Sequence, residues 1–109
     1  MTVRRIWNLF LLRLSFSATR LLKVPVHFGK PASMSIEPTT SCNLGCPECP
    51  SGLKQFTRPT GKIDMELHKK LLNQINKSVF YINYYFQGEP FLHPRFLDLI
   101  KEAKRSRIY

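Results

Sequence analysis

The first helical pattern in the chain lies at residues 5–23, where apolar residues cover most of the surface of the expected helix. Arg13, Ser17 and Arg20 occur at i, i+4 and i+7 and share one polar stripe. We expect this helix to precede the folded domain and to pack on it. The alternative is a peripheral membrane contact through residues 5–23, since helices that lie in a membrane interface are commonly basic and aromatic.

Two further segments have amphipathic helical patterns. Residues 65–76 follow Asp64, which is a good N-cap residue, and a third helix is expected from Pro94 to about Arg107. The residues expected to face the core are Leu67, Leu71, Leu72 and Ile75 in the second helix, and Phe96, Leu99, Ile100 and Ala103 in the third. Lys69 and Lys70 are expected to point away from it.

Strand-like segments separate these helices. Residues 34–37 form a short strand that ends at Pro38, and residues 79–86 are rich in aromatic and β-branched residues, as in a strand covered on both faces. Residues 108–109 resemble the start of a third strand. Alternating strands and helices predict an α/β fold with parallel strands. In such folds ligands bind at the C-terminal ends of the strands, so the segments after the strands form the candidate site.

The three cysteines of the chain, Cys42, Cys46 and Cys49, lie in one loop at Cys-x3-Cys-x2-Cys spacing. Thiolates suit zinc and iron–sulfur clusters, and an odd number of cysteines argues against an internal disulfide framework. Three interpretations remain open: a [4Fe–4S] cluster with one iron free for a cofactor, a Cys3His zinc site, and three unliganded cysteines. In the second interpretation the chain is a small basic module that contacts nucleic acid or membrane, and its fourth zinc ligand is His27, His68 or His93.

The cysteine spacing resembles the signature of the radical S-adenosylmethionine (SAM) superfamily. Residues 35–44 read as a strand that runs into a cysteine loop, as in that family, and Gln87-Gly88-Glu89-Pro90 is similar to its Gly-Gly-Glu-Pro segment. The resemblance extends from about Met34 to the end of the chain. It implies the N-terminal portion of a partial (β/α)6 TIM-like barrel, with two βα units, the start of a third strand and a preceding helix.

The resemblance also implies the cofactors and the chemistry. The three cysteines would each bind one iron of a [4Fe–4S] cluster, and the fourth iron would bind the methionine part of SAM. Gly88, Glu89 and Pro90 match the segment that contacts the SAM amino group. Reductive cleavage of SAM would give a 5′-deoxyadenosyl radical that abstracts hydrogen from a substrate. A flavodoxin or ferredoxin would supply the electron.

Some residues depart from the family pattern or refine it. Glu48 stands where many members have an aromatic residue, and Gln87 replaces the first glycine of Gly-Gly-Glu-Pro. The Cys-Pro-x-Cys-Pro form of the loop resembles the branch with a C-terminal SPASM domain, in which several members modify peptides or proteins. Glu37, which follows the first strand, is expected either to point into the barrel mouth or to form a salt bridge. We expect His93 to lie at a helix start rather than bind a metal.

Length and charge limit these expectations. The chain has 109 residues, and a full TIM barrel takes about 250. We therefore expect residues 1–32 to be a basic helix with its connection, and residues 33–109 to be an incomplete radical SAM core that needs the C-terminal part of the barrel. The net charge is +10, and residues 1–32 contain six basic and no acidic residues. We favour a solvated basic surface over nucleic-acid binding. Reduced cysteines favour the cytoplasm.

Overall fold

The structure is a computed structural model that describes residues 2–109 of the chain. It has the α/β organisation that the sequence predicts. The elements follow in the order α1 (Val3–Leu22), β1 (Ser33–Ser35), α2 (Met65–Ile75), β2 (Tyr81–Asn83), the 3-10 helix η1 (Pro90–Leu92) and α3 (Phe96–Arg105).

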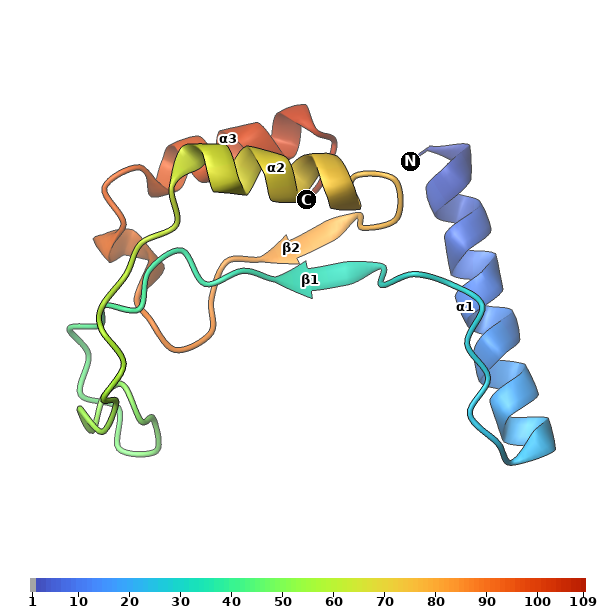
Figure 1. The fold of residues 1–109 in the computed structure, drawn as a ribbon, viewed down its shortest axis with the longest axis horizontal. Coiled ribbons are helices and arrows are strands. Elements are labelled where there is room, and N and C mark those ends of the chain that lie inside the picture. Colours follow the sequence, from blue (N-terminus) through green and yellow to red (C-terminus); the bar gives the residue numbers. More distant parts are fainter. Residues whose placement is uncertain (1) are drawn as a thin grey trace.

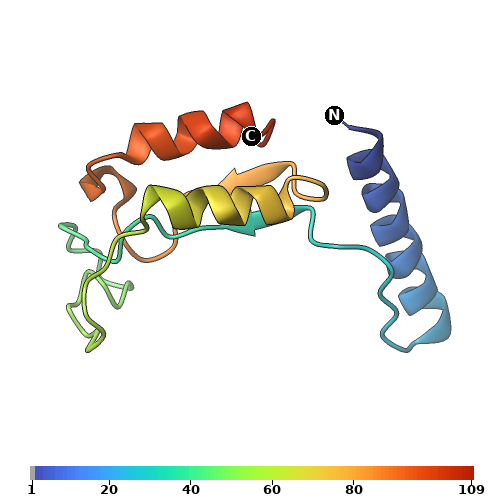
Figure 2. The same ribbon diagram turned by 45° about the horizontal axis from the view of Figure 1, so that its top comes forward.

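The two strands pair in parallel, with Met34 of β1 opposite Ile82 of β2. The chain crosses from β1 to β2 through α2, and both α2 and α3 lie over the same face of the sheet (Figures 1 and 2). Side chains alternate between the faces of a strand, so Ile82 points to the helices and Tyr81 to the other face. Tyr81 is 46% exposed. The expectation that this strand is covered on both faces is therefore wrong for residues 2–109.

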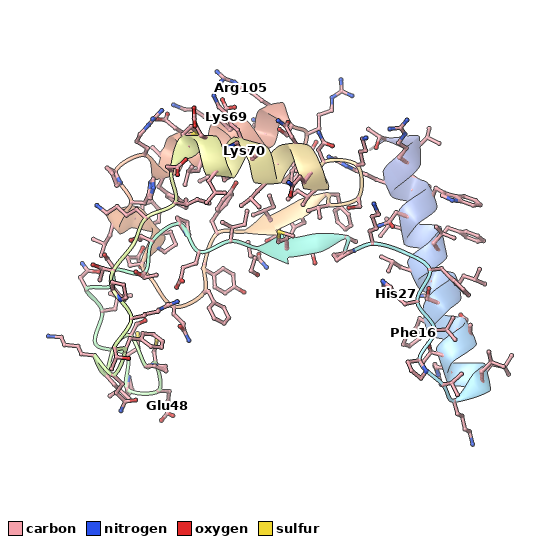
Figure 3. The ribbon with its side chains drawn as sticks, in the orientation of Figure 1. Phe16, His27, Glu48, Lys69, Lys70 and Arg105 are labelled. Atoms are coloured by element: carbon pink, nitrogen blue, oxygen red, sulfur yellow. The ribbon has the colours of Figure 1, made fainter. Side chains whose placement is uncertain are left out.

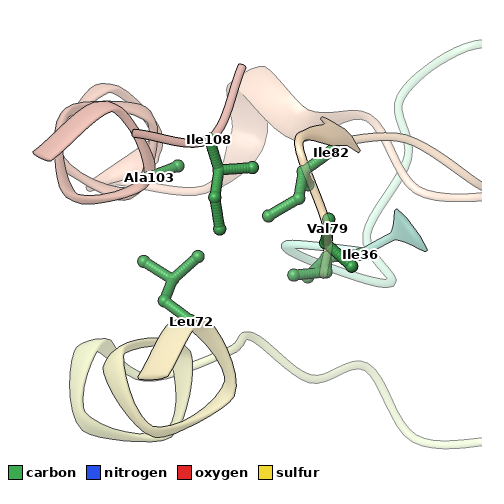
Figure 4. Close-up of a cluster of buried hydrophobic side chains, with 6 residues drawn as sticks. All are labelled: Ile36, Leu72, Val79, Ile82, Ala103 and Ile108. Carbon is green, nitrogen blue, oxygen red and sulfur yellow. The ribbon is translucent and has the colours of Figure 1, made fainter. Parts of the chain in front are cut away.

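The core forms between the sheet and the two helices. Ile82 and Ile36 meet Leu72 of α2 and Ala103 of α3 there (Figure 4). Val79 and Ile108 complete this cluster, and Leu99 of α3 is fully buried beside it. The spacing of Leu99 and Ala103 places both on the core side of α3, as the amphipathic pattern predicts. Ile100 of the same pattern is 39% exposed, so its predicted place in the core is wrong.

The second strand is shorter than its apolar sequence suggests. β2 covers three residues rather than residues 79–86, and Tyr85 and Phe86 beyond it are exposed. The free edge of β2 is paired at the end of the chain, because the Tyr109 amide donates to the Phe80 carbonyl at 2.9 Å and the Ile82 amide to the Tyr109 carbonyl at 2.6 Å. Residues 108–109 thus take the position of a third strand.

Helix α2 starts as expected, since the Asp64 carboxylate accepts a hydrogen bond from the Leu67 amide at 2.7 Å. Its buried side is rotated from the predicted one. His68 and Leu72 are buried, whereas Leu67 is 48% exposed. The reason is that His68 finds a polar partner inside the fold, so the helix can turn this side chain inward. Lys69 and Lys70 project away from the sheet, as does Arg105 of α3 (Figure 3).

The partner of His68 is Tyr84, whose hydroxyl oxygen lies 2.7 Å from the His68 Nε2 atom. Burial lowers the pKa of His68, and nearby His93 lowers it further while Glu102 opposes the shift. Burial also raises the pKa of Tyr84 to about 12. The pair is therefore neutral at physiological pH.

This pair predicts a loss of stability in weak acid. The unfolded chain binds a proton at an ordinary histidine, whereas folded His68 resists protonation because its pKa is lowered. The free energy of unfolding should fall as the pH falls below about 6.5, and continue to fall until the lowered pKa of His68 is passed. Urea unfolding from about pH 7.5 to about pH 5 measures this slope. His68→Gln should flatten it; an unchanged slope would contradict the assignment.

Helix α1 stands beside the α/β unit and touches it at its N-terminal end (Figures 1 and 2). Buried Arg5 makes this contact. Its guanidinium donates to the carbonyls of Asn76, Ser106 and Arg107, where α2 and α3 end. Within residues 2–109, the expected packing of this helix on the domain is limited to this contact at its N-terminal end. None of the helices in this part of the chain has the length and apolarity needed to cross a membrane.

Candidate functional site

The candidate site is a long loop between β1 and α2, and its base is closed by backbone pairing. Thr39 and Lys62 form an antiparallel bridge. The Thr40 amide donates to the Gly61 carbonyl at 3.0 Å, and the Thr40 hydroxyl accepts from the Gly61 amide at 2.7 Å. Residues 41–60 therefore leave and return at one fixed point, beyond the C-terminal end of β1.

All three cysteines lie in this loop as free thiols. Cys46 is exposed, and Cys42 and Cys49 are half-buried. The backbone amides of Gly52 and Ser51 donate to the Cys49 sulfur and lower the pKa of its thiol, since such bonds favour the thiolate. The Leu53 amide also donates to the Cys49 carbonyl at 2.9 Å. The backbone after Cys49 is thus arranged around this side chain.

Gly52 is needed for this arrangement. A Cβ atom on Gly52 would lie 2.5 Å from the carbonyl oxygen and 2.6 Å from the nitrogen of Cys46. The backbone can approach this closely only because glycine has no side chain. The sequence reasoning assigned no role to Gly52; its position three residues after Cys49 was the available signal.

The donor set fits a thiolate-bound metal centre. Three soft ligands occur on one loop, and none is tied up in a disulfide. Within residues 2–109, no three His, Cys, Asp or Glu side chains lie close enough together to hold one metal ion. Binding of one metal centre by all three thiols would therefore require them to converge. The exposed position of Cys46 leaves its side chain free to move.

The turn at residues 87–90 lies against the start of the cysteine loop. The Glu89 amide donates to the Ser41 carbonyl at 2.8 Å. A Cβ atom on Gly88 would lie 1.7 Å from the Thr39 carbonyl oxygen and 3.2 Å from that of Ser41. The two segments that follow the parallel strands are therefore side by side, as the topology predicts. The Glu89 carboxylate caps η1 by accepting from the Phe91 amide at 3.1 Å.

Glu37 holds this turn in place. Its carboxylate accepts from the amides of Gln87 at 3.1 Å and Gly88 at 2.9 Å. Arg58, on the returning side of the loop, forms a salt bridge with Glu37 at 3.2 Å and donates to the Gln87 side chain at 3.2 Å. Of the two roles expected for Glu37, the structure shows the salt bridge. Gln87, which stands at the first glycine of the Gly-Gly-Glu-Pro pattern, joins the loop to the turn through its side chain.

Sequence reasoning did not find Arg58, because 21 residues separate it from Glu37 and no local pattern connects them. Arg58 also stacks over the Phe56 ring at 4.6 Å. Both line an open cavity of about 250 Å³ beside Cys42, together with Lys54. Because Arg58 is paired with Glu37, Lys54 supplies the remaining positive charge at this cavity, which favours an anionic group there.

Within residues 2–109, no histidine joins the cysteines in a group that could hold a metal ion. His68 is buried against Tyr84, and His93 is buried with its Nε2 atom 2.9 Å from the Ile63 carbonyl oxygen. The Nδ1 atom of His93 accepts from the Arg95 amide, and α3 begins just after, at Phe96. His93 therefore acts at the start of this helix, as expected. His27 is exposed in the connection after α1 (Figure 3).

Comparisons with known proteins add partial matches. No family model matches the chain. The tungsten-containing aldehyde ferredoxin oxidoreductase cofactor-modifying protein of Pyrococcus furiosus is 37% identical over 73 residues, which cover 64% of this chain and 20% of that protein. The PqqA peptide cyclase of Streptomyces rochei is 32% identical over 81 residues, which cover 74% of this chain and 22% of that protein. The chain thus spans about a fifth of the length of these relatives.

Among solved structures, the chain resembles the crystal structure of BtrN in complex with AdoMet and 2-DOIA. The TM-score is 0.61 at 24% sequence identity, over 70% of this chain and 31% of that chain. This likeness shows that the two proteins share a fold over the matched part.

Proposed function

We propose that the cysteine loop binds a [4Fe–4S] cluster through Cys42, Cys46 and Cys49 and that the adjoining turn at residues 88–90 contacts SAM. The chain would be part of a radical SAM enzyme. The observation that carries the proposal is the contact between the two segments, made by the Glu89 amide on Ser41 and by the close approach of Gly88 to Thr39. Topology alone brings the thiols and the Gly-Glu-Pro turn to one edge of the sheet.

The comparisons support the same superfamily. The fold is shared with BtrN, which was crystallised with AdoMet, and two sequence relatives each match more than half of the chain. The parallel strands with both helices on one face agree with two βα units of a partial (β/α)6 barrel. We propose residues 33–109 as the beginning of this core and residues 1–32 as its preceding helix. Further βα units would complete the barrel.

The residues of this chain would have separate roles at the site. When bound, the reduced cluster supplies the electron that cleaves SAM to methionine and a 5′-deoxyadenosyl radical. The amides of Gly52 and Ser51 stabilise the Cys49 thiolate, which is the ligand form of cysteine. Glu37 and Arg58 hold the turn at residues 87–88 against the loop. The cavity beside Cys42 would accept an anionic group near Lys54.

We further propose a peptide or protein as the substrate class, in an enzyme of the SPASM branch. The Cys-Pro-x-Cys-Pro loop supports this, as does the partial likeness to a PqqA peptide cyclase. A flavodoxin or ferredoxin would act as the electron donor, and the cytoplasm is the compartment that suits free thiols.

Anaerobic reconstitution of the chain with iron and sulfide tests the proposal. We expect about four irons and four sulfides per chain, and an EPR spectrum of the reduced protein that changes when SAM is added. Cys46→Ala should lose most of the bound iron, while Thr57→Ala, at an exposed position of the same loop, should retain it.

Each part of the proposal can fail separately. Bound zinc without sulfide would contradict the cluster and favour the zinc module. A four-iron cluster whose EPR spectrum does not change when SAM is added would contradict the SAM contact at residues 88–90 in this chain. It would still support the role of the cysteines.

A further inference from the structure

One side of α1 is covered by the segment that follows the helix. Residues 24–30 run back along the helix and are held by three polar side chains. Asn8 exchanges two hydrogen bonds of 2.8 Å with the backbone of Lys30, and Ser15 accepts from the Phe28 amide at 2.8 Å. Thr19 bonds to the backbone of Val26. The side of α1 that faces the chain is therefore this one. The predicted polar stripe of Arg13, Ser17 and Arg20 is exposed, as a polar stripe is expected to be.

The opposite side of α1 carries an apolar stripe that nothing in residues 2–109 covers. We call it the outer stripe. Its members recur at intervals of three, four and seven residues, which places them on one side of the helix. They are Val3, Trp7, Phe10, Leu14 and Leu21. All are exposed, from 46% to 83%, and the rings of Trp7 and Phe10 stack with centroids 5.4 Å apart.

Basic side chains are frequent in α1 and in the segment that follows it. Residues 1–32 contain six basic residues and no acidic one. Arg5 is used inside the fold, but the others are exposed: Arg4, Arg13, Arg20, Lys23 and Lys30. Exposed aromatic and apolar residues with such a charge suit an anionic surface that also has an apolar interior.

A second copy of this chain fits the stripe less well. Two α1 helices joined through their outer stripes would bring two sets of cations together, with no acidic residue in residues 1–32 to offset them. An anionic bilayer offers both requirements at once, because its headgroups attract the cations and its acyl region accepts Trp7 and Phe10.

We propose that α1 is a peripheral membrane anchor, whose outer stripe lies in the interface of an anionic lipid bilayer. Arg13 and Arg20 project beside the stripe and contact the lipid phosphates. This role does not depend on the proposed cluster, because α1 meets the α/β unit through Arg5, away from the cysteine loop (Figure 1).

Vesicle binding by the full chain tests the proposal. Trp7 is the single tryptophan, so its fluorescence reports the helix directly. Vesicles of phosphatidylcholine with about 30% phosphatidylglycerol are compared with phosphatidylcholine alone. We expect flotation with the anionic vesicles and a blue shift of Trp7 emission. Binding should weaken by roughly tenfold in phosphatidylcholine alone or when the salt rises from about 0.1 to about 0.5 M.

Two variants give a matched comparison. Phe10→Glu places a charge in the outer stripe, and Leu97→Glu makes the same kind of change at an exposed position of α3. Phe10→Glu should lose at least about fivefold in binding, and Leu97→Glu less than about twofold. Circular dichroism confirms that both are folded.

Three results would overturn the proposal. They are absence of flotation with anionic vesicles, equal loss of binding in both variants, and a dimer in sedimentation that Phe10→Glu dissociates while vesicles bind nothing. The last would assign the outer stripe to a second copy of the chain.

Discussion

Gly88→Ala is expected to destabilise the chain by about 3 kcal/mol, because the added methyl group would overlap backbone atoms. Its carbon would lie 1.7 Å from the Thr39 carbonyl oxygen and 2.8 Å from the Thr39 carbonyl carbon. Thr39 cannot easily retreat, since it pairs with Lys62 at the base of the loop. The turn at residues 87–90 would have to leave the cysteine loop, and the Glu89 bond to Ser41 would break.

Urea unfolding of Gly88→Ala and of a matched variant, Gly45→Ala, measures this loss. No atom lies within 4 Å of the Cβ position at Gly45. No glycine of residues 2–109 has a positive φ, so alanine is allowed by the backbone at both sites. Gly45→Ala should change the free energy of unfolding by less than about 0.5 kcal/mol. Equal effects in the two variants would show that the turn does not rest on Thr39.

Much of the α/β unit follows from local sequence. The Asp64 cap sets the start of α2, and the spacing of Leu99 and Ala103 gives the buried side of α3. The parallel order of the strands follows from their alternation with helices. The juxtaposition of the cysteine loop and the turn at residues 87–90 needs no more than this order, because both follow strand ends.

Other features depend on contacts between distant residues. The length of β2 is set by the strand with which it pairs. β1 offers only three residues for pairing, so β2 is shorter than its apolar sequence predicts. The inward turn of His68 depends on Tyr84, 16 residues later. Glu37 and Arg58 meet only because the loop returns to its own base. Local patterns do not encode such pairings.

The contact between α1 and the rest of the fold is the strongest case of this kind. Arg5 looks like one of several cations in a basic helix, yet it is only 2% exposed. Its Nε and Nη2 atoms donate to the Asn76 carbonyl at 2.9 and 2.7 Å, and further bonds reach Ser106 and Arg107, residues about a hundred positions away. These carbonyls lie at the C-terminal ends of α2 and α3. A cation there also interacts favourably with the negative ends of the two helix dipoles.

Arg5→Ala should therefore lower the free energy of unfolding by about 3 kcal/mol, since buried carbonyls at two helix ends would lose a charged donor. Thermal unfolding should show this as a decrease in Tm of roughly 10–20 °C. Arg4→Ala is the matched control. It removes the same side chain from an exposed neighbouring position, and should cost less than about 0.5 kcal/mol.

Arg5→Lys distinguishes hydrogen bonding from charge alone. An ammonium group keeps the favourable interaction with the helix ends but cannot reach the carbonyls of Asn76, Ser106 and Arg107 in the way that a planar guanidinium does. We expect its Tm to lie between those of the wild type and Arg5→Ala. If Arg5→Ala unfolded at the temperature of Arg4→Ala, α1 would not be fastened through this residue, and the contact between the helix and the α/β unit would have to lie elsewhere.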